Sequence, residues 1–154
     1  MMANKEMIEH LNIVLGNELI AINQYILHSR MFKEWGYGQL AEKTFAESID
    51  EMKHADILIQ RILYLKGIPN LQHLGKLNIG ENPKEMLASD LELERLSIKA
   101  YQQAIMHAEQ CQDFGTRDKL KNILMNEEEH VEFLETQLEL MKNLGEAQYL
   151  STQL

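Results

Sequence analysis

The chain has 154 residues, of which 45% are hydrophobic and 25% charged, and its formal net charge at pH 7 is −9. This length and composition predict one domain, residues 1–154, with a sizeable buried core. The acidic balance argues against a nucleic-acid partner, because phosphate binding requires clustered Lys and Arg. A single cysteine, no signal-peptide pattern and no apolar run of membrane-spanning length together predict a cytoplasmic protein that does not act at a membrane.

The first half of the chain predicts two long helices. Residues 5–35 carry apolar side chains at intervals of three and four, which is the spacing of one helical face. Gly36 and Gly38 predict a turn after this helix. A second helix is expected over residues 39–65, because Gly67 follows as a stop signal.

The second half predicts two more helices after a long connection. Residues 67–82 are rich in Gly and Asn and have no helical pattern. Pro83 begins a third helix that is expected to run to about Cys111. Thr116 is expected to cap a fourth helix that runs to about Asn143. The tail after it, EAQYLSTQL, predicts a short fifth helix or a frayed end. Two short turns that flank one long connection indicate an all-α four-helix bundle, with a crossover between its second and third helices.

Two Glu-x-x-His motifs organise the chain. Glu51 and His54 form the first, and a spacing of three residues places both side chains on one face of a helix. Glu127 and His130 repeat it, and each motif follows a lone glutamate by 33 residues. One shift of 76 residues relates all three pairs, so an internal repeat carries the candidate metal ligands, which are Glu18, Glu51, His54, Glu94, Glu127 and His130.

Four carboxylates and two imidazoles form a mixed oxygen and nitrogen set, which suits iron or manganese better than structural zinc. Two ions that share six side chains need bridging carboxylates, and Glu51 and Glu127 suit this role because each lies beside its own histidine. Glu18 and Glu94 are then terminal ligands. Four buried carboxylates without a cation would repel one another. The sequence therefore predicts a two-metal site with open positions for dioxygen chemistry.

Other polar residues on these helices leave alternatives open. Tyr25 and Tyr101 lie two turns after the lone glutamates, where they either hydrogen-bond a ligand carboxylate or serve as core tyrosines. Asp50 and Glu47 lie just beyond the ligand face, either as residues that pass ions to inner-surface iron or as part of a solvated helix face. The remaining histidines share no ligand spacing and are interpreted as surface or packing residues: His10, His28, His73 and His107.

A second stripe on the predicted second helix points about a quarter-turn away from the metal face, and it contains Met52. Phe45, Ile49 and Ile59 share that direction, so the helix is apolar beyond the needs of a four-helix core. This pattern favours an oligomer interface. A methionine in such a stripe is usually interface packing, although methionine sulfur is also an axial ligand for haem iron.

Four segments of the chain are GNELIAINQYILHSRMFKEWG, ESIDEMKHAD, IPNLQHLGKLNIGE and NEEEH, and all four resemble those of the bacterioferritins. The likeness extends over essentially the whole chain. It implies a ferritin-like four-helix bundle with a short C-terminal fifth helix, and it matches the six candidate ligands to the family's ferroxidase centre. It also implies that Met52 is the axial ligand of a b-type haem shared between two subunits across a twofold axis.

The resemblance further implies that Fe(II) is oxidised by O2 or H2O2 at a di-iron centre and stored as ferric mineral in a 24-subunit shell built from twofold dimers. A small [2Fe-2S] ferredoxin is the implied partner for iron release. Ala46 departs from the family pattern, because some members carry there a histidine that binds inner-surface iron. An auxiliary iron site that uses Asp50 or Glu47 would therefore lack this ligand.

Two other functions remain open from the sequence. One is a di-iron oxidase or peroxidase of the same fold, which forms a small oligomer and stores no iron. The other is a haem-binding electron carrier with a vestigial metal site. Iron far above about two ions per chain would distinguish storage from the first alternative. The effect of a Met52 substitution on the haem spectrum would test whether this residue is the axial ligand.

Overall fold

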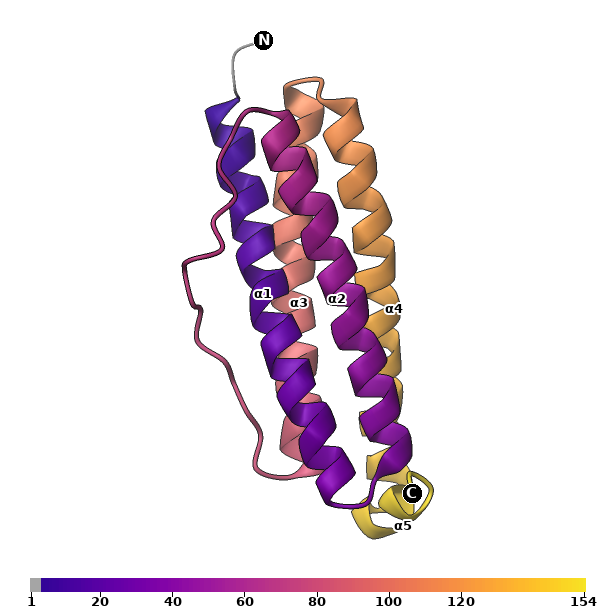
Figure 1. Ribbon diagram of the computed structural model, residues 1–154. Coiled ribbons are helices and arrows are strands. Elements are labelled where there is room, and N and C mark those ends of the chain that lie inside the picture. Colours follow the sequence, from indigo (N-terminus) through magenta and orange to yellow (C-terminus); the bar gives the residue numbers. More distant parts are fainter. Residues whose placement is uncertain (1–3) are drawn as a thin grey trace.

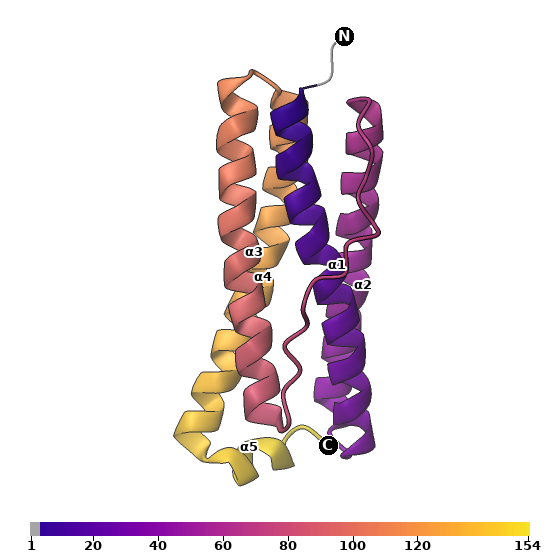
Figure 2. The same cartoon turned by 90° about the vertical axis from the view of Figure 1, so that its left-hand side faces the viewer.

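The computed structural model describes residues 4–154, and five helices form in that range. Figures 1 and 2 show four long helices that lie side by side as a bundle, with the fifth at one end. The helices are α1 (Lys5–Glu34), α2 (Gly38–Tyr64), α3 (Pro83–Gln110), α4 (Phe114–Leu144) and α5 (Glu146–Ser151). The helix α1 packs mainly against α2, and α3 mainly against α4. The predicted all-α bundle with a crossover and a short fifth helix is confirmed.

Side chains at the starts of three helices satisfy backbone amides that the first turn leaves unpaired. The side chains of Asn4 and Asn82 accept hydrogen bonds at the starts of α1 and α3, and Pro83 fits the first turn of α3 because no N–H is needed there. At the start of α4, the Asp113 carboxylate accepts a hydrogen bond of 3.1 Å from the Thr116 amide. The prediction that Thr116 caps this helix is therefore wrong, because the charged acceptor lies three residues earlier.

The connection between α2 and α3, residues 65–82, runs back along α1 (Figures 1 and 2). The Asn12 side chain holds its first part, because it donates to the Ile68 carbonyl at 3.2 Å and accepts from the Asn70 amide at 2.8 Å. Further along, the Gln24 side chain accepts a hydrogen bond of 3.0 Å from the Asn78 amide. The crossover therefore follows one helix closely and returns the chain to the end at which α2 began.

Two clusters of buried apolar side chains fill the bundle, one on each side of its middle. The first apolar cluster comprises Met7, Leu11, Val14, Leu15, Ala55, Leu58, Ile62, Leu65, Tyr101, Ala104, Ala108, Leu120 and Ile123. The second comprises Phe32, Leu40, Ala41, Met86, Leu87, Leu91, Leu134, Met141 and Tyr149. Residues related by the shift of 76, such as Leu11 and Leu87, fall in different clusters, so the repeat describes a pseudo-twofold axis between them. Within residues 4–154, no helix has the length and apolar character that crossing a bilayer requires.

Candidate metal centre

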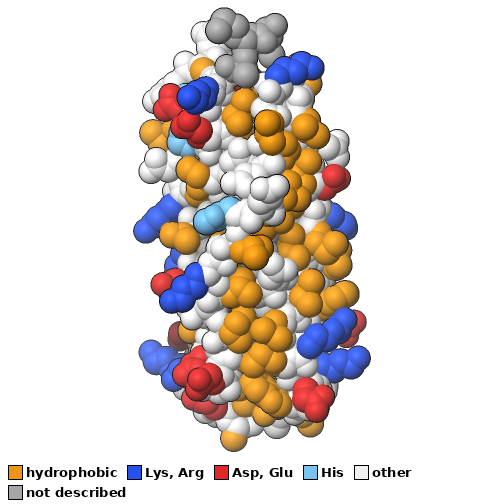
Figure 3. Space-filling view, turned by 60° about the vertical axis from the view of Figure 1, so that its left-hand side comes forward, with side chains coloured by type: hydrophobic (Ala, Val, Ile, Leu, Met, Phe, Trp, Pro, Cys, Tyr) orange, Lys and Arg blue, Asp and Glu red, His pale blue; other side chains and the backbone are white. Residues whose placement is uncertain are grey.

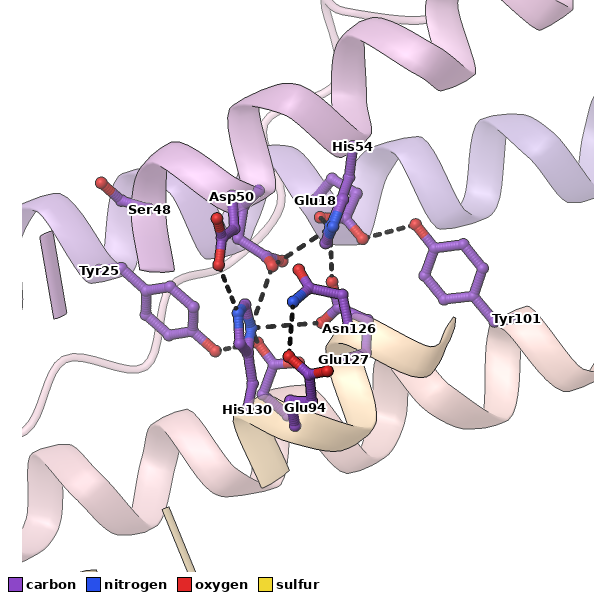
Figure 4. A network of polar contacts seen from close by, with 12 residues as sticks. Glu18, Tyr25, Ser48, Asp50, His54, Glu94, Tyr101, Asn126, Glu127 and His130 are labelled. Carbon is purple, nitrogen blue, oxygen red and sulfur yellow. Dashed lines mark hydrogen bonds and ion pairs between the residues drawn. The ribbon is translucent and has the colours of Figure 1, made fainter. Parts of the chain in front are cut away.

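The six candidate ligands come together in the middle of the bundle, between the two apolar clusters. Figure 4 shows Glu18, His54, Glu94, Glu127 and His130 pointing toward one another. All six are at most 6% exposed. They form two overlapping groups whose ligand atoms lie within 4.8 Å of one another: Glu18, Glu51, His54 and Glu127, and Glu51, Glu94, Glu127 and His130. Glu51 and Glu127 belong to both groups. This is the arrangement that two bridging and two terminal carboxylates would adopt around two cations.

Each histidine points its Nδ1 atom at the carboxylates. The Nδ1 atom of His54 lies 2.7 Å from Glu127 Oε1 and 3.4 Å from both Glu18 and Glu51. The Nδ1 atom of His130 lies 3.3 Å from Glu51 Oε1. The two imidazole centroids are 6.4 Å apart. Two nitrogen atoms and the shared carboxylates therefore converge on a pair of adjacent positions.

Several buried atoms in this group have no hydrogen-bond partner among the described residues. They are Glu18 Oε2, Glu51 Oε1, His54 Nδ1, Glu94 Oε2, both carboxylate oxygens of Glu127, and His130 Nδ1. The 2.7 Å contact between His54 and Glu127 is an ion-pair distance without hydrogen-bond geometry. Buried polar atoms without partners are costly, and so many in one place indicate a site for cations. The donor set fits iron or manganese ions.

Burial and mutual repulsion shift the titration of these groups. Burial, together with the charges of the neighbouring carboxylates, raises the pKa of Glu51 and Glu127 well above the ordinary value. Burial alone would lower the pKa of His54, but its contacts with Glu127 and Glu18 raise it to about 10. Burial also opposes the charge on His130, but its interaction with Glu94 raises its pKa to about 10. Without cations the centre therefore holds protons, and metal ions must displace them.

Two tyrosines connect the halves of the centre. The Tyr101 hydroxyl on α3 donates a hydrogen bond of 2.5 Å to Glu18 on α1, and the Tyr25 hydroxyl on α1 donates to Glu94 on α3. Burial, followed by the charges of the nearby carboxylates, raises the pKa of both phenols well above 10, so each keeps its proton. The sequence left open whether these tyrosines hydrogen-bond a ligand carboxylate or only pack in the core. In the structure, each hydroxyl donates to a candidate ligand carboxylate.

Asp50 and Glu47 lie on the same side of the centre but in different environments. The Asp50 carboxylate is 39% exposed, and its Oδ2 atom lies 3.0 Å from His130 Nε2, behind the nitrogen that faces the cluster. Glu47 is only 3% exposed and its Oε1 atom has no partner among residues 4–154. Burial raises its pKa to about 8. The interpretation as a solvated helix face is therefore wrong for Glu47. The contact from Asp50 to His130 joins α2 to α4. Because the two residues lie on different helices, their spacing in the sequence does not predict this contact.

A second buried polar group, formed by Gln24, His28 and Asp90, was also not predicted from the sequence. The His28 ring accepts a hydrogen bond at Nε2 from the Gly80 amide, at 3.1 Å, so its Nδ1 carries the proton and donates to Asp90 at 2.9 Å. The Gln24 side chain donates a second bond to Asp90, at 2.8 Å. The interpretation of His28 as a packing residue holds, but it also anchors the crossover.

Comparison with known proteins agrees with this geometry. The ferritin-like domain family matches residues 8–144. The chain is 42% identical to the bacterioferritin of Mycobacterium leprae over 149 residues, which cover 97% of this chain and 94% of that protein. It is 43% identical to the bacterioferritin of Brucella melitensis and 44% identical to bacterioferritin BfrA of Mycobacterium tuberculosis, with 97% of this chain covered in each case and 92% and 94% of the relatives. The chain belongs to the bacterioferritin family.

Met52, for which the sequence resemblance predicts a role as haem ligand, lies on the outside of α2 and is 47% exposed. It is therefore separate from the buried centre. Figure 3 shows hydrophobic side chains gathered along the length of one face of the bundle. Large exposed hydrophobic residues occur on α1 and on the crossover, namely Ile13, Ile26, Leu27, Ile68, Leu71 and Leu74. An apolar face of this length is typical of a surface that a partner covers.

Proposed function

We propose that this chain oxidises Fe(II) at the buried centre and stores the product as ferric mineral inside a 24-subunit shell. Membership of the bacterioferritin family supports iron storage. The observation that carries the oxidation step is the pair of overlapping ligand groups, which share Glu51 and Glu127. Shared carboxylates hold two cations close together, so that one molecule of O2 or H2O2 can take an electron from each.

The side chains divide the work of binding. Glu18 and His54 hold one iron ion, Glu94 and His130 hold the other, and the two shared glutamates bridge them. Six side chains leave coordination positions open for the oxidant. Tyr25 and Tyr101 orient the two terminal carboxylates, and Asp50 holds the outer nitrogen of His130, which fixes the ring orientation as outer hydrogen bonds do at other metal sites.

The exposed apolar face supports assembly into twofold dimers, from which the shell is built. Met52 lies exposed on α2 and is suited to donate its sulfur to a b-type haem that two subunits share. A small electron-donating [2Fe-2S] ferredoxin is the proposed partner for iron release.

Aerobic iron loading tests the storage proposal. Fe(II) is added in portions, the protein is separated by size-exclusion chromatography, and iron is measured in the protein peak. We expect iron far above about two ions per chain in a very large particle. Iron that stops near about two ions per chain on a small oligomer would instead identify the alternative, a di-iron oxidase or peroxidase without storage.

A substitution pair tests whether the buried centre performs the oxidation. Glu127→Ala removes a shared ligand, so we expect rapid Fe(II) oxidation, followed as ferric absorbance, to fall by about 100-fold or more. Glu128→Ala is the matched control, because this neighbouring carboxylate is exposed and belongs to neither ligand group. Undiminished oxidation by the Glu127 variant would remove the centre from the mechanism.

The haem proposal has its own pair of variants. Met52→Leu keeps the volume but removes the sulfur, so we expect the haem absorption bands to be lost or shifted. Met106→Leu changes an exposed methionine on α3 and is expected to leave the spectrum unchanged. An unaltered spectrum in the Met52 variant would contradict the axial-ligand assignment. Normal haem with no iron oxidation in the wild type would favour the electron carrier.

A further inference from the structure

A second group of metal-ligating side chains lies at the end of the bundle where α1 begins and α3 ends. Glu6 and His10 are one helical turn apart on α1, and His107 lies on α3. One ligand atom from each of the three lies within 4.8 Å of the others. The two imidazole rings are stacked, with centroids 5.1 Å apart and planes inclined by 29°. Two nitrogen donors from different helices therefore share one small volume with a carboxylate.

Hydrogen bonding does not account for this arrangement. The Nε2 atom of His107 is buried and has no partner in the part of the chain that the structure describes. The Nδ1 atom lies 3.8 Å from Glu6 Oε1, which is too long for a hydrogen bond. The His107 side chain is nevertheless only 13% exposed, so water solvates it poorly. An imidazole in this condition lacks the partners that a purely structural histidine normally has.

The group is separate from the buried centre. His10 precedes Glu18 by eight residues on α1, which is about 12 Å along the helix axis. His107 follows Tyr101 by six residues on α3, which is about 9 Å. Buried side chains of the first apolar cluster, such as Leu15 and Ala104, fill the interval. The three residues therefore cannot serve as ligands of the two interior ions.

We propose that Glu6, His10 and His107 bind one divalent first-row transition-metal ion, of which Zn²⁺ and Fe²⁺ are the best matched. Two imidazoles and one carboxylate form a donor set that such ions prefer, whereas Mg²⁺ and Ca²⁺ prefer oxygen ligands alone. Glu6 is 68% exposed, so its carboxylate is free to rotate toward an ion held by the two rings. Water completes the coordination on the exposed side. The bound ion joins the start of α1 to the end of α3.

Zinc-binding stoichiometry tests this site apart from the interior one. Metal-free protein is dialysed against buffered Zn²⁺, and the bound zinc per chain is measured. We expect a variant with both His10→Phe and His107→Phe to bind about one ion fewer than the wild type, because the phenyl rings keep the stacked packing but donate no nitrogen. His73→Phe, in the exposed crossover, is the matched control and is expected to keep the wild-type number. Equal binding by the double variant and the wild type would overturn the proposal.

Two further measurements keep the result decisive. Glu6→Gln changes an exposed side chain and leaves the fold intact, so it is expected to weaken only this zinc ion. In crystals soaked with Zn²⁺, an anomalous peak is expected about 2.0–2.1 Å from a ring nitrogen of each histidine. A soaked crystal without a peak between these three residues would contradict the site. Glu127→Ala is expected to weaken interior zinc binding and to leave this peak, so failure of the iron-oxidation proposal would be distinguishable from failure of this one.

Discussion

The two candidate metal positions of the buried centre have matching candidate ligands but different surroundings. Glu18 and His54 correspond to Glu94 and His130 through the shift of 76, and the two tyrosines correspond in the same way. The residues that surround the two positions do not correspond in this way. Around the Glu94–His130 position lie Glu47, Asp50, Gln24, His28 and Asp90, whose counterparts are Ile123, Asn126, Ala100, Ala104 and Val14. The repeat therefore preserves the candidate ligands, while the polar neighbours of the Glu94–His130 position have mostly apolar counterparts.

We infer that this difference gives ions unequal access to the two positions, although the His54 side chain is 8% exposed and that of His130 only 3%. The Glu18–His54 position faces the first apolar cluster, which contains Val14, Ala104 and Ile123. The Glu94–His130 position has the half-exposed Asp50 carboxylate behind its histidine. We therefore expect ions to enter and leave through the Glu94–His130 side, and the ion at the Glu18–His54 side to exchange more slowly.

The largest expected effect comes from giving the Glu18–His54 side a buried glutamate like the one on the Glu94–His130 side. Ile123 is 2% exposed and occupies the position that corresponds to Glu47. Ile123→Glu would bury a carboxyl group among apolar side chains, so we expect metal-free protein to lose about 3–5 kcal/mol of unfolding free energy, measured by denaturant titration. Asn122→Glu places the same residue on the neighbouring exposed position and should cost about 0.5 kcal/mol or less. Similar losses in both variants would show that the two sides do not differ in this respect.

A smaller effect is expected from the hydrogen bond behind one histidine. Asp50→Ala removes the acceptor from His130 Nε2, and loss of such outer contacts typically weakens metal affinity by about 10–100-fold. Asn126→Ala changes the corresponding residue on the other side, whose side chain bonds to the exposed Glu129 and not to His54. Anaerobic titration with Zn²⁺ should show the weakening only in the Asp50 variant. Equal Zn²⁺ affinities in the two variants would contradict the proposed difference between the two sides.

The pH dependence of the metal-free fold follows from the raised pKa values. The folded protein raises the pKa of Glu47 from 4.5 to about 8, and that of His54 and His130 from 6.5 to about 10. It therefore binds protons more tightly than the unfolded chain does. The resulting stability is fully present below the unfolded pKa of each group and is lost as the pH rises through the folded value. We expect the Tm of metal-free protein to fall between about pH 4.5 and about pH 10.

Two controls sharpen this expectation. Saturating Zn²⁺ replaces the protons, so the Tm of the loaded protein should not decline across the same range. Glu47→Gln should reduce the decline between about pH 4.5 and about pH 8, because it removes one titrating group from one side. The pKa of Glu94 is lowered and acts in the opposite direction, so the net slope is the sum over the centre. A Tm that rises with pH in metal-free protein would contradict the titration scheme.

The smallest effects are expected where the two sides agree. Tyr25→Phe and Tyr101→Phe each remove one hydrogen bond to a candidate ligand carboxylate, and each should cost about 1 kcal/mol of unfolding free energy. Tyr37→Phe is the control, because this phenol is only partly buried. Thermal unfolding of the three variants measures these losses of unfolding free energy, and the Tyr37 variant is expected to lose less than the other two. Markedly unequal costs at Tyr25 and Tyr101 would mean that the pseudo-twofold relation does not extend to the tyrosines.

Much of this fold was predictable because its information is local. Periodicity, together with glycine and proline at the breaks, placed the four long helices to within a few residues, and spacing along single helices paired Glu51 with His54 and Glu127 with His130. The repeat then brought the halves together. Contacts between helices were not predictable, because they depend on helix rotation and on the axial register of packed helices. The bond from Asp50 to His130 and the stacking of His10 on His107 both join different helices. The burial of Glu47 was missed for the same reason.

The crossover has a consequence for how the protein survives proteases. It has no regular structure, and it carries the trypsin sites Lys66 and Lys76. Yet Gly75 lies so near α1 that a Cβ there would be 2.3 Å from the Ile20 side chain, and Asn12 fixes the segment through two hydrogen bonds. A protease must draw a substrate segment away from the fold in an extended form, and these anchors oppose that. Cleavage in the crossover should therefore be slow, and it should proceed through opening of the segment from α1.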